Sequence, residues 1–373
     1  MVLGGPVVGE EFYDREGLIK ELLEGLADTN YSLIGPRGCG KSSLLHELTR
    51  RRTKDFVPVL VNVRETVPMT PRNMVRAIGR KVLYAILKEK GLLRSMPALV
   101  SSKVANVIEF IRDNMRIKIG DWLTLYFDES SDITELIENT FRAIECYDMK
   151  PLVMIDEITG LVRLSGAKPN DRDIDFMWAL GEHTSTAKNA RYIISGSQTG
   201  VMDFLTKKET GPFVRRFAPK EIGGLEESGA NRLIADKIKR RVNENYVNEL
   251  KKRTRLLPLY LQAYCLATNA HMGKLEGPND VEEKVFGLLH GHFLYLESLL
   301  SESELLALLA LDTSSRVSDL SDKISIPYNT LQATLRRLEL KGFVKAKEPG
   351  VFETLDPIFQ MWLVKTHELG GGV

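Results

Sequence analysis

The sequence of 373 residues has few cysteines, few glutamines and no long uninterrupted apolar run. Its three cysteines, Cys39, Cys146 and Cys265, are far apart and fit neither a disulfide framework nor a metal-ligand spacing. This use of cysteine is typical of a reducing compartment, so we expect a cytoplasmic protein. Only four glutamines stand beside 51 Lys and Arg residues and 50 Asp and Glu residues, a balance that occurs in thermophilic proteins.

Membrane segments and strong net charge are also missing. No apolar run approaches the roughly 20 residues of a membrane helix, and the first six residues are too short and too broken for a signal peptide. The formal net charge is +1, so any binding of nucleic acid must come from a local basic face. With 43% hydrophobic and 27% charged residues, the chain has the composition of a soluble globular protein of two or three domains.

A glycine-rich segment, residues 35–42, matches the phosphate-binding loop pattern G-x-x-x-x-G-K-[ST] in full. An apolar run precedes it and an amphipathic pattern follows it, as expected for a strand, a loop and a helix N-terminus that together hold an anion. Lys41 is expected to reach the β- and γ-phosphates of a nucleotide, and the Ser42 hydroxyl is expected to bind Mg²⁺. The predicted phosphate-contacting residues are Gly35, Pro36, Arg37, Gly38, Cys39, Gly40, Lys41, Ser42 and Ser43.

A second motif, residues 151–157, is an apolar strand that ends in two carboxylates. In a parallel sheet these side chains lie at the carboxyl edge, beside the phosphate-binding loop. Asp156 is expected to hold Mg²⁺, directly or through water, and Glu157 is expected to polarise the attacking water as a general base. The alternative is a pair of solvated acids at a strand end.

The apolar run at residues 192–195 predicts a strand beside the one that carries Asp156. Its end carries Ser195, Ser197 and Gln198, whose side chains are candidates to touch the γ-phosphate or the attacking water. A plain Ser/Gly turn is the alternative interpretation.

Two arginines, Arg215 and Arg216, precede a weaker apolar run at residues 219–222. One of them is a candidate to stabilise charge on the γ-phosphate, either in the same chain or from a neighbouring subunit. The alternative is an arginine pair on the surface.

The order of these patterns predicts an α/β fold, in which helices connect the strands of a parallel sheet. The five strands are expected at residues 31–34, 57–63, 152–155, 192–195 and 219–222. We expect residues 1–224 to form this domain, with a helical insertion at about residues 72–148 on the sheet edge. Helices are expected in that insertion near residues 73–90, 98–117 and 132–147.

Strand patterns vanish beyond residue 225, and charged amphipathic patterns at 226–241 and 243–270 predict a helical lid over residues 225–295. Residues 296–373 are expected to form a winged helix-turn-helix domain. It would have helices at 302–311, 316–324 and 328–341, followed by a β-hairpin.

The third helix of this winged helix carries the candidate contacts to double-stranded DNA. Its leucines are expected to face the core, which leaves polar side chains on the opposite face. Lysines of the hairpin are placed to reach the DNA backbone. The candidates are Tyr328, Asn329, Gln332, Arg336, Lys345 and Lys347. A winged helix that makes only protein contacts is the alternative.

The chain resembles the archaeal ATPase family in four places. These are the two nucleotide motifs, the N-terminal Phe-Tyr-Asp-Arg-Glu of residues 12–16, and the C-terminal Asp-Pro-x-Phe-x-x-Trp-Leu of residues 356–363. This family belongs to the AAA+/STAND branch of P-loop NTPases and is related to Orc1/Cdc6-type initiators. The resemblance implies ATP and ADP as ligands with Mg²⁺, and it implies that Phe12, Tyr13 and Arg15 lie near the adenine. Arg255 lies near the place of a phosphate-sensing arginine of the initiators, without a matching motif.

Together these patterns predict an Mg²⁺-dependent, AAA+-like P-loop ATPase with a helical lid. Its nucleotide state would switch a C-terminal winged helix that acts on DNA. The alternative is a STAND-type signalling switch, in which the winged helix contacts a protein instead. The sequence leaves open whether the chain forms a homo-oligomer.

Overall fold

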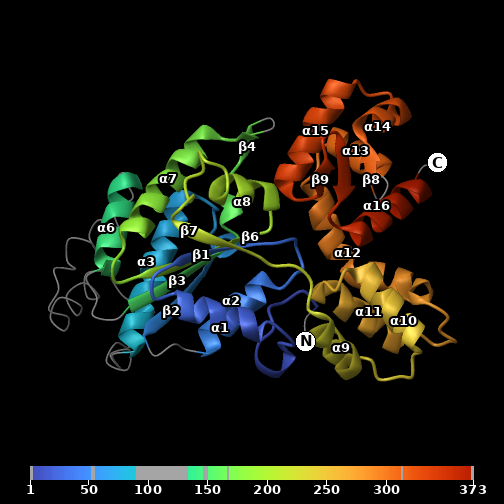
Figure 1. Cartoon of the computed structure of the whole chain (residues 1–373), viewed down its shortest axis with the longest axis horizontal. Helices are drawn as coiled ribbons and strands as arrows, with labels where there is room; N and C mark the ends of the chain where they lie inside the picture. The colour runs from blue at the N-terminus through green and yellow to red at the C-terminus, as the bar shows by residue number, and fades with distance from the viewer. Residues whose placement is uncertain are drawn as a thin grey trace.

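The computed structural model describes residues 3–51, 55–89, 133–145, 150–165, 168–311 and 314–370. One lobe is built around a sheet, and a second lobe holds the helices and small strands that follow residue 225 (Figure 1). Within the described part of the chain, no helix combines the length and the apolar character that a membrane span requires.

A five-stranded sheet in the order β2-β3-β6-β1-β7 forms the centre of the first lobe, and all neighbouring strands are parallel. The predicted α/β fold with a parallel sheet is thereby confirmed. Each strand contains most of an apolar run that the sequence marks as a strand. The strands are β1 (Asn30–Ile34), β2 (Phe56–Asn62), β3 (Lys150–Asp156), β6 (Arg191–Gly196) and β7 (Phe217–Glu221). Because all five are parallel, their carboxyl ends meet at one edge of the sheet.

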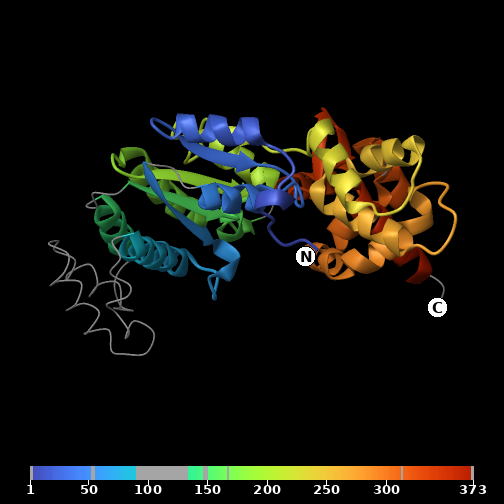
Figure 2. The same cartoon turned by 90° about the horizontal axis from the view of Figure 1, so that it is seen from below.

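Helices cover both faces of the sheet (Figure 2). Leu152 and Met154 of β3 face a core that includes α1 (Glu16–Gly25) and α2 (Lys41–Arg51), and the alternating Val153 faces the other side. The opposite face carries α3 (Pro71–Glu89), α6 (Ile133–Glu145), α7 (Asp171–Thr186) and α8 (Thr199–Thr206). With both faces covered, the strand ends at the carboxyl edge become the place where a ligand can approach.

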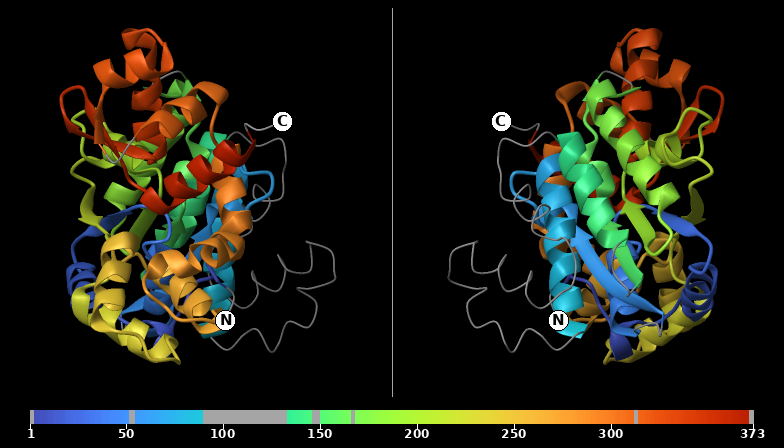
Figure 3. Two further views of the ribbon diagram at one scale, coloured as in Figure 1. Left: turned by 90° about the vertical axis from the view of Figure 1, so that its right-hand side faces the viewer. Right: turned by 90° about the vertical axis from the view of Figure 1, so that its left-hand side faces the viewer.

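The predicted helical insertion is described only in part. The helices predicted near residues 73–90 and 132–147 are α3 and α6, which pack beside each other next to the edge strand β2 (Figure 3). The helix predicted at residues 98–117 lies outside the described residues. A short hairpin of β4 (Leu164–Ser165) and β5 (Lys168–Pro169) was not predicted, because two-residue strands leave no periodic pattern.

The lid contains α9 (Glu227–Lys237), α10 (Glu244–Thr254), α11 (Pro258–Ala270) and α12 (Glu282–Ser298). The single helix predicted at residues 243–270 is wrong, because the chain breaks between α10 and α11. Arg255 and Leu256 both adopt the left-handed conformation, with φ of 49° and 59°. Pro258 lacks the N–H that a continuous helix would need, and it starts α11 at a position that suits proline.

The winged helix follows α12. Its helices are α13 (Glu302–Ala310), α14 (Val317–Ile324) and α15 (Tyr328–Lys341), and its strands are β8 (Ser314–Arg316), β9 (Val344–Glu348) and β10 (Val351–Thr354). The sequence did not indicate β8, a three-residue strand that pairs with β10. The last helix, α16 (Pro357–Gly370), packs Phe359 and Trp362 against Phe293 of α12, with ring centroids 5.8 Å and 5.3 Å apart. This aromatic cluster anchors the winged helix to the lid.

Candidate functional site

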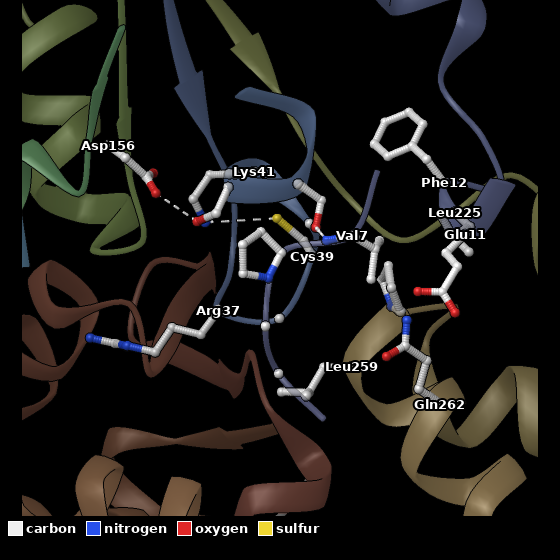
Figure 4. A pocket seen from close by; sticks show the side chains of 18 of the residues that line it. Val7, Glu11, Phe12, Arg37, Cys39, Lys41, Asp156, Leu225, Leu259 and Gln262 are labelled. Carbon is white, nitrogen blue, oxygen red and sulfur yellow. Dashed lines mark hydrogen bonds between the residues drawn. The ribbon is translucent and has the colours of Figure 1, made fainter. Parts of the chain in front are cut away.

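A pocket of ≈ 330 Å³ lies at the carboxyl edge of the sheet. It is lined by the N-terminal segment, the glycine-rich loop, the ends of β2 and β3, and the helices α11 and α12. Figure 4 shows Asp156 and Lys41 at one end of this pocket and Phe12 and Leu225 at the other. We call these the phosphate end and the base end, after the parts of a nucleotide that their chemistry suits.

The glycine-rich loop has the backbone that an anion site requires. Gly38 and Gly40 adopt φ of 76° and 94°, a region that residues with a side chain rarely occupy. Lys41 is only 4% exposed, and its Nζ donates hydrogen bonds to the carbonyls of Gly35 (2.7 Å) and Pro36 (3.0 Å). The ammonium therefore rests against the loop, and phosphate oxygens offer it stronger, charge-assisted partners.

Ser42 and Asp156 come together across 114 residues of sequence. The Ser42 hydroxyl donates to Asp156 Oδ2 at 2.7 Å, and the Ser195 hydroxyl donates to Oδ1. One carboxylate beside one hydroxyl is the donor set that Mg²⁺ uses when substrate phosphates supply further oxygens. The described residues contain no group of three or more His, Cys, Asp or Glu side chains that could hold a metal ion, so they offer no closed protein cage. The residues present fit a nucleotide-bound Mg²⁺.

Glu157 lies next to Asp156 in the left-handed conformation, with φ of 60°. This strained backbone is the kind that clusters at functional sites. Its Oε2 accepts from the Ser197 hydroxyl at 2.8 Å and lies 3.4 Å from Arg64 Nη2. Burial alone would raise the pKa of Glu157, but Lys41, Arg64, Ser197 and Arg37 together hold that pKa below its ordinary value. The carboxylate is therefore ionised and able to accept a proton.

The polar residues at the carboxyl end of β6 and just after it lie at the same edge. Ser195 is bonded to Asp156 and Ser197 to Glu157, so both orient the carboxylates. Gln198 Nε2 donates to the carbonyl of Thr159 at 3.4 Å, which places its amide beside the segment that follows Glu157. The structure thus brings together all the predicted polar groups of β1, β3 and β6.

The predicted base contacts line the other end of the pocket, but most of their polar groups are already bonded. Arg15 Nη2 donates to the carbonyls of Cys39 (2.5 Å) and Gly223 (2.9 Å), and burial lowers the pKa of Arg15. The Tyr13 hydroxyl donates to Asp236. Arg15 therefore braces the phosphate-binding loop, and Phe12 is left as the aromatic surface of this end.

The side chains of Ser43 and Cys39 make contacts within the protein that hold the loop in place. Ser43 Oγ accepts from the backbone N–H of Val7 at 3.1 Å, which ties the N-terminal segment to the loop. Cys39 is fully buried and lies 3.7 Å from Lys41 Nζ.

The two predicted arginines, Arg215 and Arg216, lie away from the phosphate end, as does Arg255, which the sequence left unassigned. Arg215 and Arg216 precede β7, so they sit at the amino edge of the parallel sheet, about 16 Å from the loop for strands of five residues. This placement contradicts a role for either arginine at the phosphates of its own chain. At the amino edge, Arg216 pairs instead with Glu182 at 2.6 Å. Arg255 reaches the winged helix instead, where its Nη1 donates to the carbonyl of Thr354 at 3.2 Å.

The predicted DNA contacts lie on the exposed side of the winged helix. Tyr328 is 44% exposed and Asn329 is exposed, whereas Gln332 is half-buried. Arg336 is paired with Glu339 at 2.7 Å and lies over the ring of Phe352. In the wing, Lys345 and Lys347 are exposed, and Lys345 pairs with Glu353 at 2.8 Å. The basic side chains are thus partly neutralised within the fold.

Sequence reasoning missed a group of residues that approach the phosphate end from other segments. Arg64 contacts Glu157, and its guanidinium lies 5.6 Å from the ring centroid of Tyr295 on α12. His292 of α12 also lines the pocket, and burial, followed by the charges of Arg37 and Arg64, lowers its pKa to about 4. The sequence could have indicated Arg64, because this residue comes just after β2 and that strand ends at the same edge of the sheet. No sequence pattern indicated that His292 and Tyr295 of α12 would reach the pocket.

Arg37, in the middle of the phosphate-binding loop, contacts the winged helix. Its Nη1 donates to the carbonyl of Lys341 at 3.2 Å, and its guanidinium lies 5.1 Å from the ring centroid of Phe343. Beside it, α15 packs on α8, where a Cβ on Gly200 would lie 2.5 Å from the carbonyl of Glu339. The winged helix therefore sits directly on the loop and on the segment after β6.

Comparisons with known proteins agree with this geometry. Residues 12–246 match the family described as an ATPase domain predominantly from Archaea, and residues 300–357 match the sugar-specific transcriptional regulator TrmB. A Walker-type ATPase of Pyrococcus abyssi has a similar structure, with a TM-score of 0.65, 18% identity, and coverage of 96% of this chain and 98% of that chain. The ORC2 protein of Aeropyrum pernix, in complexes with ADPNP and ADP, gives a TM-score of 0.54 at 12% identity, covering 97% and 95%. No curated protein matches the sequence.

Proposed function

This chain belongs to the family of ATPase domains found predominantly in Archaea, and from that membership we propose that it hydrolyses ATP with Mg²⁺ at the phosphate end. The observation that carries the proposal is the meeting of Lys41, Ser42, Asp156 and Glu157 at the carboxyl edge of the sheet. Lys41 would hold the β- and γ-phosphates, and Glu157 would take a proton from the attacking water. Mg²⁺, bound by Ser42 and Asp156, would offset the charge of the phosphate oxygens.

Replacement of Glu157 by Gln tests the assignment of Glu157 as the general base. The substitution removes the carboxylate that would accept the proton and keeps the size and shape of the side chain. We expect ATP affinity to be retained and turnover to fall about 10²- to 10⁴-fold. Titration of Mg²⁺ into chelator-treated protein should restore turnover in the unmodified chain only. Unaltered turnover of the Glu157→Gln variant would exclude Glu157 as the base.

We further propose that nucleotide state controls the position of the winged helix. The support is Arg37, which belongs to the loop that would hold the phosphates and also contacts Lys341 and Phe343. An incoming triphosphate competes for this guanidinium, because a charged oxygen is a better acceptor than a backbone carbonyl. Loss of the contact would weaken the docking of α15 on the ATPase lobe.

Double-stranded DNA is the partner that we propose for the winged helix. The support is the match to a transcriptional regulator and the exposed Tyr328 and Asn329 at the start of α15. Affinity for duplex DNA should fall as salt rises, because phosphate contacts release counterions. Absence of binding at about 50 mM salt, with or without ATP, would exclude this partner.

A protein partner is a second candidate, and one observation favours it. Residues 300–357 contain seven Lys and Arg residues but nine Asp and Glu residues, so this segment is not basic overall. The chain would then act as a signalling switch. Slow turnover that DNA does not stimulate would support this candidate over the first.

A further inference from the structure

We propose that Gln262 reads the base of the nucleotide and makes the pocket selective for adenine. This inference rests on the proposed binding of ATP. Gln262 lies on α11, outside every motif of the sequence, and its side chain lines the base end of the pocket.

The position of Gln262 is fixed relative to the phosphate-binding loop. The backbone N–H of Leu259 donates to the carbonyl of Gly38 at 3.3 Å, so α11 begins directly against the loop. Close packing reinforces this contact, because a Cβ on Gly38 would lie 2.9 Å from Leu259 Cβ. Gln262 follows Pro258 by four residues and therefore lies on the same helix face, one turn further from the phosphates.

The amide of Gln262 has unused hydrogen-bonding capacity. The side chain is only 7% exposed, and within the described part of the chain it makes no hydrogen bond to any residue. A primary amide carries two N–H donors and an acceptor oxygen, and the amide of Gln262 is not sealed from solvent, so these groups are open to the pocket. Its neighbours Tyr13 and Arg15 are bonded within the protein, so Gln262 is the amide left for an occupant of the pocket.

The surroundings suit a flat base with an amino group at its edge. Phe12, Leu225 and Leu259 supply apolar surface at this end. In Figure 4 the amide of Gln262 and the carboxylate of Glu11 point toward the same region of the pocket. Glu11 Oε1 accepts from Lys237 at 3.1 Å, which leaves Oε2 to accept from an amino group at the edge of the base. Adenine carries such a group at C6, where guanine has a carbonyl oxygen. Glutamine pairs with adenine through one donor and one acceptor side by side.

A double-mutant cycle between protein and ligand tests the proposed hydrogen bond between the Gln262 amide and the amino group of adenine. It compares a change in the protein with a change in the ligand, so it does not depend on a single variant. The protein arm is Gln262→Met, which keeps the length of the side chain. The ligand arm is purine riboside triphosphate, which lacks the amino group of ATP. We expect each change alone to weaken binding about tenfold, and both together to weaken it little further. We also expect the preference for ATP over GTP to shrink in the variant.

Control measurements separate the possible failures. Inorganic tripolyphosphate should bind the variant and the unmodified chain equally, and Gln360→Met, a similarly buried glutamine in the winged helix, should leave ATP affinity unchanged. Equal ATP affinity of Gln262→Met and the unmodified chain would overturn the proposal while ATP binding stands. If Gln262→Met weakened the binding of ATP but not that of 2′-deoxyATP, Gln262 would contact the ribose and not the base. This result would also overturn the proposal. An unmodified chain that binds neither ATP nor tripolyphosphate would overturn the proposed function itself.

Discussion

The two ends of the pocket are built in different ways. At the phosphate end, groups from the loop, β3 and β6 meet because parallel strands share a carboxyl edge, and each motif is continuous in sequence. At the base end, the lining residues come from the N-terminal segment, α9 and α11, which are distant from one another in the sequence. The proposed chemistry is therefore concentrated at one end, whereas the proposed recognition of the base is spread over the N-terminal segment and the lid. The two ends should respond differently to substitution.

The largest effect is expected from Lys41→Ala at the phosphate end. This change removes the cation that offsets phosphate charge in a site where Lys41 is almost fully buried. Binding of ATP and of tripolyphosphate should both weaken by about 100-fold or more, as expected when a buried charge-assisted contact is lost. Calorimetry with both ligands measures this. If tripolyphosphate affinity survived while ATP affinity fell, the assignment of the two ends would be wrong.

Phe12→Ala should break the base end alone. Loss of a stacking surface costs about 1–3 kcal/mol per base, so ATP affinity should fall about tenfold. Tripolyphosphate should bind as before, because it has no base. Phe12→Leu serves as the matched control, since it keeps apolar volume but loses the flat ring. An equal loss for both ligands would show that Phe12 shapes the loop and does not contact the base.

Arg64→Ala should produce a smaller change, in turnover rather than affinity. Arg64 is partly exposed and pairs with Glu157, and such pairs contribute about 0.2–1 kcal/mol. Freed from this pair, Glu157 should reach the attacking water more readily, and turnover should rise about two- to fivefold. Arg64→Lys keeps the charge and should stay close to the unmodified rate. A fall in turnover with Arg64→Ala would instead give Arg64 a supporting role in hydrolysis.

Replacement of both Arg215 and Arg216 by Ala should have the smallest effect on a dilute chain. They lie at the opposite edge of the sheet, so ATP affinity should not change. If a neighbouring subunit uses them, turnover should fall only at protein concentrations where chains associate. Weaker ATP binding in dilute monomer would contradict their placement.

The fold and the phosphate end were largely predictable from the sequence, because both depend on local patterns. Apolar runs marked the strands, and the residues after them, such as Lys41 and Asp156, had to meet at one edge. The base end was not predictable to the same extent. Gln262 belongs to no motif, and its role depends on the break at Arg255 and Leu256 that turns α11 onto the loop. The contact of Arg37 with Phe343 joins residues about 300 positions apart, which no local pattern reports.

The central claim is that the phosphate-binding loop controls the winged helix, and amide hydrogen exchange of the Glu157→Gln chain tests it most directly. The segment to follow is residues 338–344, where α15 ends against Arg37 and Gly200. We predict faster exchange in this segment with saturating ATP than with no nucleotide, because the triphosphate draws Arg37 away from Lys341. Identical exchange in the two states, with ATP binding verified by calorimetry, would contradict the claim.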